Sequence, residues 1–137
     1  MTPDQISLVQ QSFRQVEAIQ ETAARIFYAR LREADPSTAP LFAKSDMALQ
    51  GHKLMAAIAM VVNGLNRPEV VIPAAQDMAR RHVGYGVTRA HYASVGAALL
   101  WTLGQGLGAS FTPEVEAAWT AAYDLLSAIM IEAAYPG

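Results

Sequence analysis

Three histidines, His52, His82 and His91, are the side chains of this sequence whose type best suits metal binding or proton transfer. The sequence contains no cysteine, which excludes disulfides, thiol catalysis and zinc–thiolate sites. A transition metal that binds tightly must therefore use these imidazoles or be held by a cofactor.

His82 lies on an apolar stripe of a predicted helix, together with Ala75 and Met78. Arg80 and Arg81 precede it and point elsewhere around the helix. An imidazole among apolar groups, with cations nearby, suits a haem site in which the ring is the axial iron ligand. A half-buried histidine without a cofactor fits the same pattern, so the spacing alone leaves both interpretations open.

The elements that would position these residues are helices, because the apolar residues recur at helical spacing almost throughout. We expect the last two helices to exceed 20 residues each and to pack as an antiparallel hairpin. The expected segments are a helix that starts at Pro3, a helix over about 21–34, a short turn-like helix at 36–42, a helix from about 46 to 63, a shorter one after Pro73 that Gly84 and Gly86 end, one capped by Thr88 and stopped by Gly104, Gly106 and Gly108, and one that starts at Pro113.

The chain length predicts one domain over residues 1–137, and the helical spacing of its apolar residues predicts that this domain is all-α. Hydrophobic residues make up 53% of the chain, enough to fill a core and also to line an apolar pocket or a homodimer interface. A net charge of −2 argues against a nucleic-acid partner. The longest apolar run, 54–62, is too short for a bilayer and no signal pattern opens the chain, so we expect a cytoplasmic protein.

Five short motifs occur in the order and at the separations of a globin. They are Phe27-Tyr28, Pro40-Leu41-Phe42, Gln50-Gly51, Arg81-His82 and His91-Tyr92. The chain most resembles bacterial single-domain haemoglobins and the haem domains of flavohaemoglobins, and from Ser94 to Trp119 it also resembles neuroglobin-like chains. The resemblance implies a globin fold, a three-on-three helical sandwich around a pocket for haem b.

The resemblance also assigns roles, residue by residue. His82 matches the iron ligand, and Phe42 matches the phenylalanine that stacks on the porphyrin. Tyr28 and Gln50 match the polar pair over the sixth coordination site, and Leu54 matches the apolar residue over the iron. Both polar side chains can donate hydrogen bonds to bound dioxygen, each worth roughly 1–3 kcal/mol in a dry pocket, and less to carbon monoxide.

Further positions are expected to contact the cofactor. Val87 falls where an apolar residue lines the far side of the haem, and Met78 shares the stripe of His82. Lys53 and Arg81, with Arg80, are candidates for the propionates, although they can equally be solvated surface charges. Trp101, Trp119 and Tyr123 are expected in the core or at an interface instead.

An alternative register remains open on the Tyr28 side. A shift of two residues would put His52 over the iron in place of Gln50, giving a six-coordinate haem. We prefer Gln50 because Gly51, where two helices cross, and Leu54 then both fall where a globin needs them.

Tyr92 matches a tyrosine that lies near the iron-bound histidine and works with a glutamate on the last helix. Glu132 is the candidate glutamate here, but it lies one or two residues short of the family position, where alanine stands. Tyr92 can therefore also be a simple core residue.

The resemblance implies a protein that binds dioxygen reversibly and converts nitric oxide to nitrate. No Gly-rich dinucleotide fingerprint occurs in the chain, so a separate reductase is the expected partner. The alternatives are a non-catalytic store or delivery protein, a six-coordinate redox or sensor globin, and a globin-shaped interaction domain without haem.

Overall fold

Residues 1–136 of the computed structural model form six α-helices and two 3-10 segments, and Gly137 lies outside the described part. No strand occurs among these residues, and the prediction of an all-α fold is confirmed. The elements are α1 (Pro3–Glu17), α2 (Gln20–Ala34), η1 (Pro36–Phe42), α3 (Met47–Asn63), α4 (Pro68–Gly84), α5 (His91–Leu107), η2 (Gly108–Ser110) and α6 (Pro113–Ala134).

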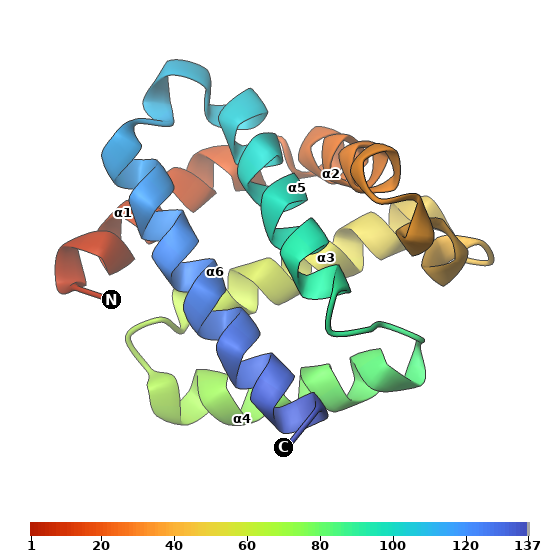
Figure 1. Ribbon diagram of the computed structural model, residues 1–137. Coiled ribbons are helices and arrows are strands. Elements are labelled where there is room, and N and C mark those ends of the chain that lie inside the picture. The colour runs from red at the N-terminus through yellow and green to blue at the C-terminus, as the bar shows by residue number, and fades with distance from the viewer. Residues whose placement is uncertain (137) are drawn as a thin grey trace.

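The helices form two layers of three (Figure 1). Helices α1, α3 and α4 make one layer, and α2, α5 and α6 make the other. The main contacts across the layers join α4 and α1 to α6, and α3 to α2. Within residues 1–136, no helix has the length and apolar character needed to traverse a bilayer.

The predicted threonine–proline starts are confirmed at both ends of the chain. The Thr2 hydroxyl accepts from the Gln5 N–H, and the Gln5 side chain accepts from the Thr2 N–H, each at 3.1 Å. Thr112 caps α6 by accepting from the Val115 N–H at 3.3 Å. Each cap satisfies backbone donors that a helix start otherwise leaves free.

Helix α4 is longer than the sequence predicts, because it begins at Pro68 and not after Pro73. Pro68 occupies the first helical position, where its fixed φ is favourable and its missing N–H costs nothing. Pro73 forfeits only one hydrogen bond in the second turn, while Val71 and Ala75 bury the same face of the helix. Gly86, at φ 96°, follows the helix end as predicted.

Helix α5 differs from its prediction at both ends. The Thr88 side chain does not cap it; the helix begins at His91, whose Nδ1 accepts from the Thr88 N–H at 3.0 Å. The helix continues through Gly104 and Gly106 and ends at Leu107, because only Gly108 adopts a positive φ, 55°. It therefore has 17 residues, fewer than the 20 expected, whereas α6 has 22.

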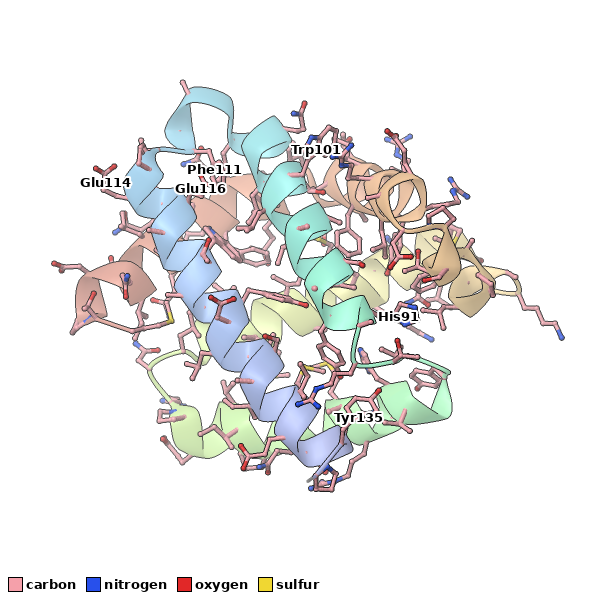
Figure 2. All side chains as sticks on the ribbon, viewed as in Figure 1. His91, Trp101, Phe111, Glu114, Glu116 and Tyr135 are labelled. Atoms are coloured by element: carbon pink, nitrogen blue, oxygen red, sulfur yellow. The ribbon has the colours of Figure 1, made fainter. Side chains whose placement is uncertain are left out.

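The largest apolar cluster joins α1 to α6 and the end of α5. Phe13 and Trp119 are buried there, and the Trp119 indole donates to the Ser12 hydroxyl at 2.8 Å. Tyr123 is partly buried, and its hydroxyl donates to the Tyr92 carbonyl at 2.6 Å. Trp119 and Tyr123 therefore lie in the core, as predicted. Trp101 does not lie in the core, because it is 40% exposed on α5 (Figure 2). The Arg30 guanidinium lies over its ring, 4.9 Å from the centroid.

Candidate functional site

One side of the site is formed by Tyr28, Phe42, Gln50 and Leu54, which we call the Tyr28 wall. Tyr28 packs edge-on against Phe42, with ring centroids 5.0 Å apart, and against Phe27 at the same distance. Phe27 is buried, while Tyr28, Phe42 and Leu54 are only partly buried beside it. Helix α2, η1 and α3 therefore bring Phe42 and Leu54, 14 and 26 positions after Tyr28, to one apolar surface that is not fully buried.

The Tyr28 hydroxyl lies against α3. It donates to the backbone carbonyl of Gln50 at 3.5 Å, the upper limit of a hydrogen bond. Burial raises the pKa of Tyr28, and the contact with Gln50 opposes that shift. The phenol is therefore protonated at neutral pH and serves as a hydrogen-bond donor next to Gln50.

Gly51 sets the distance between α2 and α3. A Cβ at this buried glycine would lie 3.0 Å from the Cβ of Ala24, so a larger residue would push the two helices apart. The close crossing brings Gln50 to Tyr28 and, one turn later, turns Leu54 toward the same cluster.

His52, the alternative to Gln50, lies elsewhere in the structure. Its side chain is exposed, and Nε2 is 4.0 Å from a Glu21 carboxylate oxygen. It lines an outer groove between α2 and α3, whereas Gln50 is the residue that meets the Tyr28 hydroxyl.

The other side of the site is formed by Met78, His82, Val87 and Tyr92, which we call the His82 wall. The Nδ1 atom of His82 is buried without a hydrogen-bond partner among residues 1–136. Burial lowers the pKa of His82, and the charge of Arg81 lowers it further. The Met78 carbonyl opposes the shift, although it makes no hydrogen bond of good geometry. A neutral imidazole results, the form that ligates a metal.

Tyr92 has a second buried atom without a partner, its hydroxyl oxygen. Burial raises the pKa of Tyr92, and Tyr135 raises it further. Glu132 is exposed, and no hydrogen bond joins it to Tyr92. The Tyr92 side chain packs instead with Ala75, Ala79 and Met130, while Met78 and Val87 lie partly buried around them.

Tyr135 makes a contact with Val87 that was not predicted from the sequence. Its hydroxyl donates to the Val87 carbonyl at 2.5 Å and ties the end of α6 to the turn after α4 (Figure 2). No local sequence pattern predicts this hydrogen bond, since Tyr135 and Val87 are 48 positions apart.

A polar network around His91 was also missed. His91 is buried, and its Nε2 lies 3.2 Å from the Ser37 hydroxyl. The hydroxyls of Ser37 and Ser94 donate to the Asp35 carboxylate, each at 2.6 Å. The bonds from Ser37 and Ser94 lower the pKa of Asp35. With the Thr88–His91 bond, the network joins the turn before α5 to the corner that precedes Phe42.

Two cations predicted for a cofactor's acidic groups remain available at the surface. Lys53 and Arg81 are exposed, and neither forms an ion pair within residues 1–136. Arg80, in contrast, pairs with Asp77 at 3.0 Å. No group of three or more metal-ligating side chains occurs among the same residues.

The two walls belong to separate apolar clusters, each with partly buried side chains at its margin. Helix α3 and helix α4, which carry Gln50 and His82, make few contacts with one another. The residues present, apolar side chains on both walls and an imidazole without a partner on one, fit a flat apolar group that takes an axial nitrogen ligand, and haem is such a group.

Comparisons with known proteins identify the family. The family model described as Globin matches residues 25–130. The flavohemoprotein of Rhodopirellula baltica is 34% identical over 128 residues, which are 92% of this chain and 31% of that protein. Those of Bordetella parapertussis and Deinococcus radiodurans are 32% identical over 133 residues, which are 96% of this chain and 33% of each. The chain thus spans about a third of the length of these curated relatives.

A solved structure, described as a hexacoordinated heme protein from an anhydrobiotic tardigrade at pH 4, has the same fold. The TM-score is 0.89 over 98% of this chain and 95% of that one. Its sequence identity is 13%, so the likeness concerns the arrangement of helices and not the site chemistry.

Proposed function

The chain belongs to the globin family of haem proteins, and on that premise we propose that it binds dioxygen reversibly at a haem held by His82. The family and the three-on-three globin fold predicted from sequence are both confirmed. The proposal depends above all on one observation, the Tyr28–Gln50 pair on one wall with the neutral, partly buried His82 on the other.

Each predicted contact has a place in this proposal. His82 supplies the iron ligand and Phe42 the stacking ring, while Lys53 and Arg81 meet the propionates of a haem b. The apolar surface comes from Leu54, Met78, Val87 and Tyr92. Gln50 is favoured over His52 as the second polar residue because it is partly buried next to Tyr28, with its backbone carbonyl at the Tyr28 hydroxyl, whereas His52 is exposed beside Glu21.

Haem, when bound, supplies a ferrous iron that takes up dioxygen and gives one electron as dioxygen and nitric oxide combine to nitrate. The role of the protein is to place hydrogen-bond donors where negative charge develops. The Tyr28 hydroxyl must leave the Gln50 carbonyl to reach that point, which costs little because the bond is 3.5 Å long. Phe27, Phe42 and Leu54 surround the Tyr28 ring with apolar side chains.

Repeated turnover requires an electron donor that restores the ferrous state. The curated relatives are flavohemoproteins about three times as long as this chain. We propose a flavin-dependent reductase as the partner here, with dioxygen, nitric oxide and carbon monoxide as the diatomic ligands.

The absorption spectrum tests the haem proposal first. The purified protein should show a Soret band and, after reduction with dithionite under argon, one broad visible band typical of a five-coordinate iron. Two sharp visible bands would mean that the sixth position is filled, which would favour the His52 alternative. A spectrum without a Soret band after haem addition would contradict haem binding.

A variant pair tests the iron ligand. His82→Ala should abolish the five-coordinate spectrum of the reduced protein, and added imidazole should restore it, because the cavity admits the missing ring. His52→Ala is the matched control, since His52 is exposed and pairs only with Glu21. An unchanged spectrum in His82→Ala would remove His82 from its assigned role.

A non-catalytic oxygen store is the second candidate, and the exposed Glu132 favours it. Without a carboxylate on Tyr92, the His82 wall pushes less electron density toward the iron. Nitric oxide consumption by the protein with a reductase decides between the two. A rate no faster than that of free haem would favour storage.

A further inference from the structure

A groove of about 730 Å³ lies on the outer surface between α2, η1 and the first turns of α3. Buried Leu31 and Thr38 and partly buried Tyr28 line it, and small side chains such as Ala29, Ala43 and Ala48 stand along its sides. It shares Tyr28 and Phe42 with the Tyr28 wall, but Gln50, Leu54 and the His82 wall take no part in it.

Small residues keep the groove open. The crossing at Ala24 and Gly51 brings α2 and α3 together at one end of the groove. Ala29 and Ala48, which also line the groove, reach only as far as their Cβ atoms, so a larger side chain at either position would take up part of its volume. The charged side chains of Glu21, Arg25, Arg32 and His52 stand at its margin.

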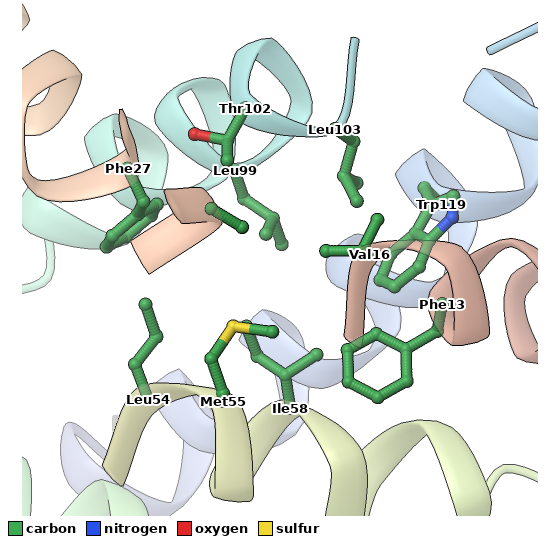
Figure 3. Close-up of a pocket in the computed structure, with 11 residues that line it drawn as sticks. Phe13, Val16, Phe27, Leu54, Met55, Ile58, Leu99, Thr102, Leu103 and Trp119 are labelled. Carbon is green, nitrogen blue, oxygen red and sulfur yellow. The ribbon is translucent and has the colours of Figure 1, made fainter. Parts of the chain in front are cut away.

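Tyr28 separates the groove from the interior. Its hydroxyl lies at the Gln50 carbonyl, and its ring contacts Phe27 on one side and Phe42 on the other. Phe27 and Leu54 also line a small internal cavity of about 20 Å³ whose surface is entirely apolar (Figure 3). Tyr28 thus lines the groove and packs against Phe27, which lines the internal cavity.

We propose that this groove is the access route of the diatomic ligand, which passes Tyr28 to reach the haem pocket. The inference rests on the proposed function and adds to it a path on the α2–α3 side of the molecule. A small uncharged apolar molecule suits this path, because the residues that Tyr28 packs against on the interior side, Phe27 and Leu54, are apolar. The single 3.5 Å hydrogen bond of Tyr28 resists rotation of the ring only weakly.

The test fills the groove from opposite sides. Ala48→Trp does so from α3 and Ala29→Trp from α2, and both positions are exposed, so each variant should fold. Ala56→Trp is the matched control, an exposed alanine on α3 that does not line the groove. The measurement is carbon monoxide binding to the reduced haem protein after flash photolysis, with circular dichroism to verify folding.

We expect association and dissociation of carbon monoxide to slow together, by about fivefold or more, in both groove variants. The dissociation constant should stay unchanged, because an obstacle on a path alters rates in both directions and not the two end states. The control should keep the rates of the unmodified protein.

Equal rates in all three folded variants would overturn the access route while leaving haem binding intact. A changed dissociation constant with an unchanged association rate would also overturn it, since the groove would then act on the bound state. Absence of a Soret band in the unmodified protein would instead overturn the proposed function, and the route with it.

Discussion

The Tyr28 wall and the His82 wall differ in how far the protein satisfies its own polar groups. On the first, the Tyr28 hydroxyl donates to the Gln50 carbonyl. On the second, His82 Nδ1 and the Tyr92 hydroxyl are buried without partners among residues 1–136. Buried polar atoms without partners cost about 1–3 kcal/mol each, so each calls for an explanation, and a bound group that supplies the partner is one.

The two walls are also held in place differently. The Tyr28 wall depends on a close helix crossing, at Gly51 and Ala24. The His82 wall depends on tyrosine hydroxyls that donate to backbone carbonyls, from Tyr123 to Tyr92 and from Tyr135 to Val87. The first wall is therefore sensitive to side-chain size, and the second also to the loss of single hydroxyl groups.

Of the substitutions that compare the two walls, Tyr28→Phe should have the largest effect on ligand binding. Removal of the hydroxyl takes a donor from bound dioxygen and should speed oxygen dissociation about 10- to 100-fold. Carbon monoxide dissociation should change far less, because that ligand carries less charge. Stopped-flow displacement of oxygen measures the rate. The control is Tyr85→Phe, whose side chain is 67% exposed. Similar changes for both gases would refute a polar role for Tyr28.

Alanine substitutions at two glycines compare the packing of the two sides. A Cβ at Gly96 would lie 2.6 Å from the Tyr123 ring, whose hydroxyl is held by Tyr92. Gly96→Ala should therefore destabilise the protein by about 1–3 kcal/mol in urea unfolding. Gly51→Ala, at 3.0 Å from Ala24, should cost less. The reverse order would mean that the Tyr28 wall is the more tightly packed.

Much of the fold could be predicted because its signals are local. The Thr2–Gln5 capping box and the Thr112 cap are recognisable within four residues. The start of α4 was missed because Pro73 is a strong local stop signal, and its cost is small in a second turn whose neighbours are buried. Thr88 also looked like a cap, but the ring of His91 takes its N–H.

The site was predictable in part, because short local motifs matched those of a known family. Register against a known family assigned Tyr28, Gln50 and His82, and the structure places Gln50 beside Tyr28. The Asp35 network and the Tyr135 bond join segments 48 to 59 positions apart, so no local pattern announces them. The distance between Glu132 and Tyr92 likewise depends on how α6 packs.

Tyr135→Phe should have a smaller effect, confined to the His82 wall. It removes the bond to the Val87 carbonyl and should lower the free energy of unfolding by about 1 kcal/mol. Amide hydrogen exchange should quicken in the turn between α4 and α5 before it changes elsewhere. Tyr85→Phe again serves as the control, and equal exchange in both variants would show that the hydroxyl does not hold the turn.

The smallest expected effect concerns pH and the network that links the two walls. Ser37 and Ser94 hold the pKa of Asp35 below its ordinary value of 3.8, so the unfolded chain binds a proton there more readily. The stabilisation is therefore present above that value and is lost as the pH falls through the folded pKa. Ser94→Ala should lower stability at about pH 6 more than at about pH 2, because the protonated carboxyl accepts hydrogen bonds less strongly. Urea unfolding at both pH values measures the difference. Ser127→Ala, which loses only a bond to the Asp124 carbonyl, should show no such dependence. A Ser94→Ala deficit that is equal at the two pH values would show that the hydroxyl stabilises the fold without acting on the Asp35 carboxylate.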